Sequence, residues 1–252
     1  MSDNNNINIL EMKNIHKSFG SLKALDNVSL DLRYSEVLGL VGDNAAGKST
    51  LMKILTGFYK ADQGSIFVEG KKVIIDLPKV SKGLGIEMVY QNLELCYNLN
   101  VAENLYLGNE ILREPFFKFL NGKAMEKKSV EILKKLKIDI SDPKKRVDKL
   151  SGGQQQAVAI SKAVSFNPKL IILDEPTANL AVKEIDKVLD IILSLKENGI
   201  PAVFISHRLD DIFQVCDRIC ILRRGKIVTI CETKSTNRDE IIRHMFFGHE
   251  LR

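Results

Sequence analysis

Residues 42 to 50 carry a glycine-containing pattern that can cradle phosphate groups. The segment from Gly42 to Ser49 fits G-x-x-x-x-G-K-[ST] and is followed by Thr50. In such a loop, successive backbone N–H groups point at phosphate oxygens, and the following helix adds its positive end. Lys48 is expected to reach the β- and γ-phosphates, and the Ser49 hydroxyl to ligate Mg²⁺. The predicted nucleotide-binding residues here are Gly42, Asp43, Asn44, Ala45, Ala46, Gly47, Lys48, Ser49 and Thr50.

A second group for magnesium is expected from the acid pair Asp174-Glu175, which follows the apolar run Leu170 to Leu173. Asp174 would hold Mg²⁺ through water, and Glu175 would orient or deprotonate the attacking water. Adjacent acids after a strand, taken alone, more often cap a helix or lie in a solvated turn. The phosphate loop upstream favours the catalytic interpretation. The two segments therefore predict that the chain binds and hydrolyses ATP, with ATP and Mg²⁺ as cofactors.

The elements that must position these residues follow from hydrophobic periodicity. Val37 to Val41 is a compact apolar run that predicts a buried strand, and it leads into the phosphate loop and a helix. Further strands are expected at Ile9 to Phe19, Leu25 to Leu32, Gly85 to Tyr90, Leu170 to Leu173, Ala202 to Ile205, Ile219 to Leu222 and Ile227 to Ile230. Gly64 to Ile75 predicts a hairpin with its turn at Glu69-Gly70. Helices are expected at Val182 to Lys196, Leu209 to Val215 and Asp239 to Phe246.

Alternation of strands and helices predicts an α/β fold whose mostly parallel sheet is covered on both faces. From about Val101 to Phe166 the pattern is helical, without a convincing strand. We therefore expect one domain, with residues 1–91 and 167–252 forming the ATP-binding core and 92–166 an inserted helical subdomain. In the helix from Val182 to Lys196, the residues Val182, Ile185, Val188, Ile192 and Leu195 are expected on one face.

Composition places the 252-residue chain among soluble globular proteins, since 44% of it is hydrophobic and 27% is charged. The polar start argues against a secretory signal, and no apolar run is long enough to span a bilayer, so a cytoplasmic protein is expected. Four cysteines without metal-type spacing are expected to be reduced thiols. Residues 113–149 hold twelve Lys or Arg against six Asp or Glu. A solvated helical face is the favoured interpretation of this basic stretch, ahead of a membrane surface and then nucleic acid.

Motifs elsewhere in the chain extend the pattern. Leu150-Ser151-Gly152-Gly153-Gln154 spells LSGGQ, and His207 lies in Ile205-Ser206-His207-Arg208. With these motifs, the sequence resembles the nucleotide-binding subunit of an ABC transporter over nearly its whole length. Gln91 is similar to the glutamine of the family's Q-loop and His207 to its switch histidine. Phe19, in His16-Lys17-Ser18-Phe19-Gly20, is similar to the aromatic residue that stacks on adenine, although such a residue at a strand end is commonly part of the core.

The resemblance implies an ABC ATPase fold, with a P-loop NTPase core, an N-terminal antiparallel β part and the helical subdomain. It also implies a homodimer that sandwiches two ATP molecules, each between one copy's phosphate loop and the other's signature, so that Ser151 and Gly153 would touch the γ-phosphate held by the second copy. The implied catalytic residues are Glu175, His207, Gln91 and Lys48, and the implied magnesium ligands are Ser49, Gln91 and Asp174. Further implied nucleotide contacts are Phe19, Ser151, Gly152, Gly153 and Gln154.

The implied partners are transmembrane permease subunits, with a solute-binding protein acting indirectly and no nucleic acid. The contact with the permease is expected near residues 93–101, and the subunit would lie at the cytoplasmic face of the cell membrane. A finer resemblance is to importers of monosaccharides such as ribose, xylose, galactose or fructose. It rests on Lys17 to Gly20, Ala24 to Ser29, Gly42 to Asn44, Leu150 to Ala159 and Ile205 to Leu209.

Two positions depart from the usual family pattern. Ala45 stands where glycine is usual, and a positive φ at this alanine would cost about 1 kcal/mol or more. Ala181, in Asn179-Leu180-Ala181, stands where most ABC proteins have an aspartate that reaches across the dimer. The alternatives are an ATPase that imports another solute, a soluble ABC-type ATPase that acts on ribosomes or DNA, and a regulator that no longer hydrolyses ATP. The last is disfavoured because the set of catalytic residues is complete.

Overall fold

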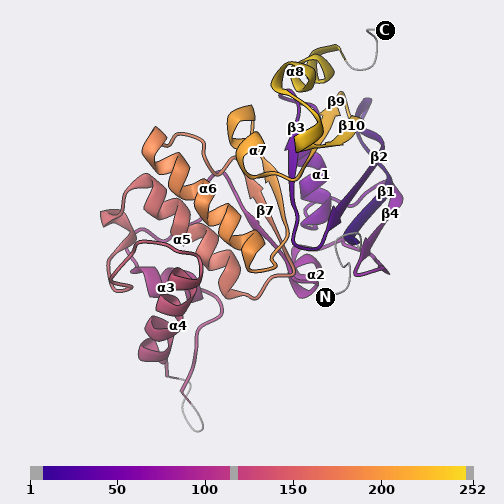
Figure 1. Cartoon of the computed structure of the whole chain (residues 1–252). Helices are drawn as coiled ribbons and strands as arrows, with labels where there is room; N and C mark the ends of the chain where they lie inside the picture. Colours follow the sequence, from indigo (N-terminus) through magenta and orange to yellow (C-terminus); the bar gives the residue numbers. More distant parts are fainter. Residues whose placement is uncertain (1–7, 114–118, 248–252) are drawn as a thin grey trace, which may run out of the picture.

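The computed structural model describes residues 8–113 and 119–247, and its centre is a six-stranded sheet (Figure 1). The strand order is β10-β9-β3-β8-β7-β6, and every pair is parallel except β9 and β10. The strands are β3 (Val37–Val41), β6 (Ile86–Val89), β7 (Leu170–Asp174), β8 (Ala202–Ile205), β9 (Arg218–Arg223) and β10 (Lys226–Glu232). The expected α/β fold with a mostly parallel sheet is confirmed.

Both faces of this sheet are buried, as a parallel sheet requires. Successive side chains of a strand point to opposite faces, and in β3 Leu38 and Leu40 belong to one apolar cluster while Val37 and Val41 belong to another. The first cluster also contains residues of α1 (Lys48–Leu55). The second also contains residues of α5 (Gly152–Ser165), α6 (Val182–Glu197) and α7 (Leu209–Val215). The continuous apolar strands of the sequence are therefore explained by burial on both sides.

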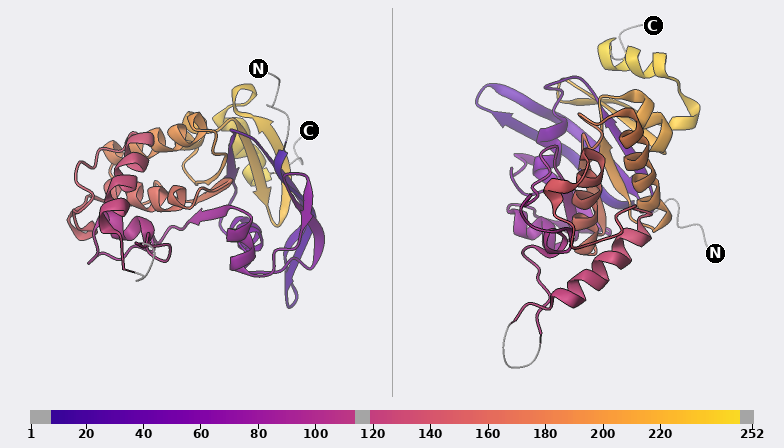
Figure 2. Two further views of the ribbon diagram at one scale, coloured as in Figure 1. Left: turned by 90° about the horizontal axis from the view of Figure 1, so that it is seen from below. Right: turned by 90° about the vertical axis from the view of Figure 1, so that its left-hand side faces the viewer.

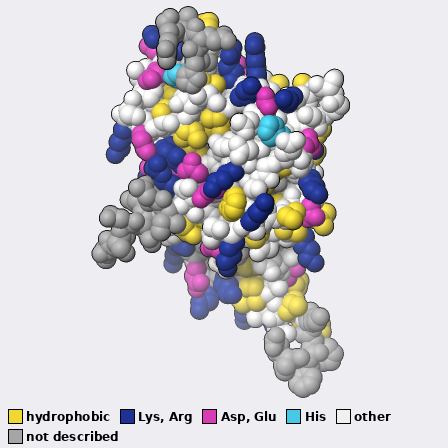
Figure 3. Space-filling model, turned by 90° about the vertical axis from the view of Figure 1, so that its right-hand side faces the viewer, with side chains coloured by type: hydrophobic (Ala, Val, Ile, Leu, Met, Phe, Trp, Pro, Cys, Tyr) yellow, Lys and Arg dark blue, Asp and Glu magenta, His cyan; other side chains and the backbone are white. Residues whose placement is uncertain are grey.

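A separate antiparallel sheet contains the N-terminal part of the described chain. Its order is β2-β1-β4-β5, formed by β1 (Asn8–Phe19), β2 (Leu22–Arg33), β4 (Gln63–Val68) and β5 (Lys71–Val73). The turn of the β4–β5 hairpin lies at Glu69 and Gly70, which both have positive φ, as expected from the sequence. On the side of the molecule seen in Figure 3, Lys and Arg side chains are dispersed among acidic ones rather than gathered in one patch.

Four further helices complete the described part of the chain. These are α2 (Pro78–Gly83), α3 (Val101–Tyr106), α4 (Gly122–Lys135) and α8 (Arg238–Phe247), with short 3₁₀ turns at Val147–Lys149 and Thr233–Ser235. The helices α3 and α4 lie at the end opposite the antiparallel sheet, as the views in Figure 2 also show. In α4, Met125, Ser129 and Leu133 are buried while the lysines are exposed, so its basic residues form a solvated helical face.

Two findings qualify the expectations from sequence. The helix α2 was not predicted, because it is short and begins at Pro78. Proline in a sequence usually indicates a loop, although it is also favoured at the first position of a helix. Of the five apolar residues expected on one face of α6, four are buried, whereas Val182 is 73% exposed. It is the first residue of the helix and projects beyond the core, which periodicity alone does not reveal. The cysteines are free thiols as expected.

Within residues 8–113 and 119–247, no helix is long and apolar enough to cross a membrane.

Candidate active site

The loop between β3 and α1 is shaped by two glycines whose positions exclude a side chain. Gly42 has φ 153°, and a Cβ atom there would lie 2.1 Å from the carbonyl oxygen of Leu222. Gly47, the N-cap of α1, has φ 110°, and its Cβ would lie 2.8 Å from the carbonyl oxygen of Ala24. The loop is thus folded tightly against neighbouring backbone. Ala45 has φ 64°, in the left-handed region, so the strain expected from sequence is present in the structure.

Lys48 begins α1 and folds back over the loop. Its Nζ donates hydrogen bonds to the carbonyl oxygens of Gly42 at 2.5 Å and Asp43 at 3.0 Å. Burial lowers the pKa of Lys48, while the negative charges of Glu175, Asp43 and Asp174 oppose this shift. A partly desolvated ammonium group that faces these acids provides a strong site for anionic oxygens. Ser49 is exposed on the first turn of α1, and Thr50 next to it is half-buried.

The acid pair lies at the carboxyl end of β7. Asp174 pairs with Ile205 of β8, and the backbone N–H of Glu175 donates to the carbonyl oxygen of Ile205 at 3.0 Å. Burial, together with the negative charge of Glu175, raises the pKa of Asp174, and the charges of Lys48 and Lys53 oppose this. Glu175 itself has φ 52°. Strained backbone of this kind is often found at functional sites.

His207 follows β8 and faces Glu175. The His207 Nδ1 atom lies 2.7 Å from Glu175 Oε2, and the histidine ring is largely exposed while the carboxylate is mostly buried. The strands β3, β8 and β7 are neighbours in the sheet. Their carboxyl ends therefore bring Lys48, the acid pair and His207 to one edge, where ligands of open α/β sheets bind.

Two further predicted residues, Gln91 and Phe19, lie on other elements. Gln91 is exposed and follows β6, the strand next to β7. Phe19 ends β1 and is 41% exposed. Its ring packs edge-to-face on Tyr59 with the centroids 5.1 Å apart, and the Lys17 ammonium lies 5.5 Å from the ring centroid. An aromatic face with this exposure is available for stacking on a flat ligand.

The LSGGQ segment lies at the start of α5. Among the described residues, the hydrogen bonds and close approaches of this segment are to residues outside the phosphate loop. Ser151 is the N-cap, and it forms a capping box with Gln154 through hydrogen bonds of 3.2 and 3.3 Å. The Gly153 N–H donates to Glu184 Oε1 of α6 at 3.2 Å, and a Cβ at Gly152 would lie 3.2 Å from Leu180. The signature is thus held by α6.

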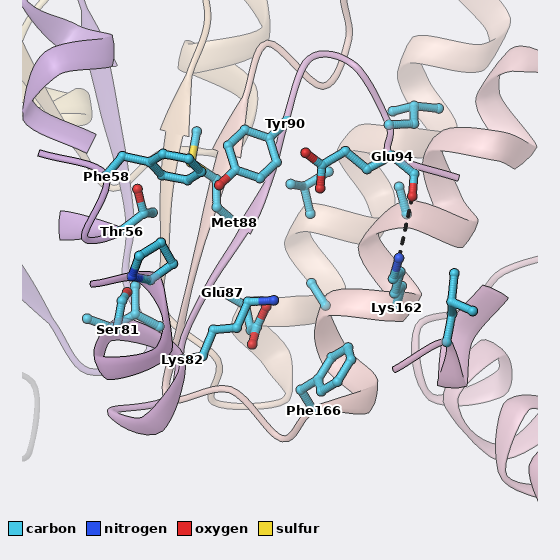
Figure 4. A pocket seen from close by; sticks show the side chains of 17 residues that line it. Thr56, Phe58, Ser81, Lys82, Glu87, Met88, Tyr90, Glu94, Lys162 and Phe166 are labelled. Carbon is cyan, nitrogen blue, oxygen red and sulfur yellow. Dashed lines mark hydrogen bonds between the residues drawn. The ribbon is translucent and has the colours of Figure 1, made fainter. Parts of the chain in front are cut away.

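A pocket of about 270 Å³ opens between β6, α2 and α5 (Figure 4). Phe58 and Tyr90 form an edge-to-face pair at one end, with centroids 6.4 Å apart. Glu87 lies buried in the wall, and burial raises its pKa while the charges of Lys82 and Lys162 oppose this shift. Tyr90 lines the pocket and directly precedes Gln91, so a ligand in the pocket would adjoin the edge of the sheet that carries the acid pair.

The sequence reasoning missed two carboxylates that join functional loops. Asp211 is buried and accepts hydrogen bonds from Thr177 at 2.6 Å and from Arg208 Nε at 3.1 Å, which ties the loop after Glu175 to the loop of His207. The other is Glu184. A capping-box pattern would have indicated it, since it lies three residues after the N-cap of α6, but alanine at position 181 hides that pattern.

Comparison with known proteins agrees with this geometry. A family described as ABC transporter matches residues 25–178. The xylose/arabinose import ATP-binding protein XylG of Sulfolobus acidocaldarius is 45% identical over 233 residues, which cover 92% of each chain. The ribose import ATP-binding protein RbsA of Bacillus subtilis is 42% identical over 242 residues, which cover 96% of this chain and 48% of RbsA. The chain thus spans about half the length of that relative.

Solved structures show the same arrangement of elements. An ATP-binding cassette of an ABC transporter in its ADP conformation has a TM-score of 0.81 and 31% identity, and 94% of each chain is covered. A dimeric structure of a bacterial ABC transporter cassette has a TM-score of 0.73 and 27% identity, with coverage of 89% of this chain and 98% of the other.

Proposed function

The chain belongs to the ABC transporter family, and we propose that it is the ATP-hydrolysing subunit of an importer that takes up a monosaccharide. The observation that carries the proposal is the convergence of Lys48, Glu175 and His207 at one edge of the sheet, with Glu175 and His207 2.7 Å apart. The choice of a sugar as substrate is supported by the similarity of the chain to the xylose/arabinose import protein XylG and the ribose import protein RbsA.

ATP fits the residues of the phosphate loop. Gly42 and Gly47 leave a cradle that side chains would block, and the partly desolvated Lys48 faces it. Phosphate oxygens would take over the hydrogen bonds that Lys48 now donates to the loop carbonyls. The adenine ring would stack on Phe19. Mg²⁺ would be held by Ser49, Asp174 and Gln91, and it would neutralise charge that develops on the transferred phosphoryl group.

Hydrolysis would depend on Glu175. Its carboxylate would orient the attacking water and accept its proton. The hydrogen bond to His207 holds the carboxylate at the exposed edge of the sheet, where the water would approach. Lys48 would stabilise the charge on the phosphates, and Asp211 would keep the loops of Glu175 and His207 in register through Thr177.

The second half of each site would come from a second copy of the chain. The signature residues Ser151 and Gly153 contact α6 rather than the phosphate loop of their own chain. In a homodimer that sandwiches two ATP molecules, they would donate hydrogen bonds to the γ-phosphate held by the other copy. Closure of the dimer would then depend on bound ATP, and hydrolysis of ATP would allow the dimer to open.

The permease would bind at the pocket of Figure 4. The pocket lies between the proposed ATP-binding core (1–91 and 167–252) and the proposed helical subdomain (92–166), and it adjoins Gln91. A segment seated there would sense movement between the two parts when ATP binds. The subunit would lie at the cytoplasmic face of the membrane, with a solute-binding protein acting through the permease and no role for nucleic acid.

The Glu175→Gln variant tests the ATPase mechanism. It keeps the shape of the side chain but removes the base, so we expect ATP binding to persist, turnover to fall by at least about a hundredfold and an ATP-bound dimer to accumulate. Turnover and the dimer fraction are measured on the purified chain. Wild-type turnover in this variant would refute the role of Glu175.

The sugar is tested with the chain reconstituted with a sugar permease and its binding protein in liposomes. We expect ATP turnover to rise when a monosaccharide is supplied and not when an amino acid is supplied. Stimulation by the amino acid alone would contradict the assignment to sugar import.

A further inference from the structure

The N-terminus of α6 is capped by a carboxylate from its own first turn. Ala181 is the N-cap residue and has no side chain that can accept a hydrogen bond. Glu184 Oε2 accepts the Ala181 N–H at 3.4 Å instead. The carboxylate is therefore held at this helix start, where the helix dipole favours negative charge.

The same carboxylate also binds the start of α5. Glu184 Oε1 accepts the Gly153 N–H at 3.2 Å. The Ser151 hydroxyl, as the largest cause, and the Gly153 N–H lower the pKa of Glu184. Glu184 is thus ionised at neutral pH, and it sits as an anion at the N-terminus of α5.

The contact is close because residue 153 is glycine. A Cβ atom at Gly153 would lie 2.8 Å from the Cβ of Glu184, which is shorter than real contacts. At Gly152 a Cβ would meet Glu184 only at 3.6 Å. The backbone of Gly153 therefore packs directly against the Glu184 side chain, which brings its N–H within reach of the carboxylate.

Each of these donors carries a single hydrogen. The Gly153 N–H and the Ser151 hydroxyl are the groups that, under the proposed function, bind the γ-phosphate of ATP on the second copy. While the Gly153 N–H is bonded to Glu184, it is not available to that phosphate. The carboxylate would also repel the phosphate if it stayed in place.

We propose that the Glu184 carboxylate occupies the γ-phosphate position of the signature in the free subunit, and that ATP must displace it for the dimer to close. The inference rests on the proposed function, because it requires an ATP sandwich between two copies. Glu184 then acts as a built-in competitor that raises the ATP and protein concentrations needed for closure. It does not contact the nucleotide bound by its own chain.

The test uses the full chain with Glu175→Gln, which slows hydrolysis, and measures the dimer fraction against protein concentration in saturating Mg-ATP by analytical ultracentrifugation. Glu184→Gln is nearly isosteric but makes weaker, uncharged hydrogen bonds. We expect it to reach half-maximal dimer at a concentration about tenfold lower than the parent, since at least one charge-assisted hydrogen bond no longer has to be broken. Glu184→Ala is expected to shift in the same direction.

Asp186→Asn is the matched control. Asp186 is an exposed acid on the same helix, so its substitution removes the same charge without touching the signature. We expect this control to dimerise like the parent. We also expect ADP binding to be unchanged in all variants, because ADP carries no γ-phosphate for the signature to contact. If Asp186→Asn lowers the concentration for half-maximal dimer as much as Glu184→Gln does, the change is caused by net charge and the proposal is wrong.

Two other outcomes distinguish a failure of the Glu184 inference from a failure of the proposed function. If the parent dimerises with ATP and Glu184→Gln needs an equal or higher concentration, the inference is wrong and the proposed function stands. If the parent forms no ATP-dependent dimer, the proposed function fails, and the inference fails with it.

Discussion

Replacing Ala45 with glycine is expected to stabilise the nucleotide-free protein. Ala45 is exposed and has φ 64°, in the left-handed region of the backbone. Its Cβ atom makes that conformation costly, whereas glycine adopts it readily. The substitution therefore removes strain without removing a buried contact.

The magnitude follows from two opposing terms. The left-handed conformation costs an alanine roughly 1–2 kcal/mol. Glycine increases the entropy of the unfolded chain, which reduces stability by roughly 0.4–1 kcal/mol. The free energy of unfolding should thus rise by about 0.5–1 kcal/mol, which corresponds to an increase in Tm of about 1–4 °C for a chain of this size.

The neighbouring alanine provides the control. Ala46 is only 3% exposed, and its φ is not positive. Ala46→Gly removes a buried methyl group, worth about 0.8 kcal/mol, and adds the same unfolded-state entropy, so it should lower Tm by roughly 2–6 °C. Thermal unfolding of both variants without nucleotide, followed by circular dichroism, makes the comparison. A fall in Tm for both variants would refute the strain argument.

Two further predictions concern the acid pair and the signature. Burial and the charge of Glu175 raise the pKa of Asp174. The free energy of unfolding therefore falls as pH rises through this pKa, because the ionised carboxylate is less stable in the folded protein than the protonated one. Asp174→Asn should therefore stabilise the nucleotide-free protein at pH 7 by less than about 1 kcal/mol, because solvent screens a partly exposed group, and should lose ATPase activity. Urea unfolding at pH 7 and at pH 3 measures the free energy of unfolding of the variant and the parent. A stabilisation by Asp174→Asn that is as large at pH 3 as at pH 7 would contradict the electrostatic origin. Gly153→Ala should be less stable than Gly152→Ala by about 1–3 kcal/mol, since its Cβ would crowd that of Glu184. Equal urea midpoints for the two variants would show that the loop relaxes freely.

Local sequence determined the elements that carry the site. The strand Val37–Val41 and the glycine loop after it were predicted because apolar runs, glycines and charged residues act over a few neighbouring positions. The acid pair at the end of β7 and the hairpins were predictable for the same reason. The short helix α2 and the exposure of Val182 were not, because they depend on where each element meets the core.

Only the tertiary structure decided which of these residues meet. Lys48, Glu175 and His207 converge because β3, β8 and β7 are neighbours in the sheet, an order that the linear sequence does not state. The contact of Glu184 with Gly153 joins residues 31 positions apart. It exists because α5 and α6 pack side by side and because Gly153 lacks a side chain. Residue types and local spacing thus determine which chemistry is possible, while packing of distant elements determines which groups hold one another before any ligand arrives.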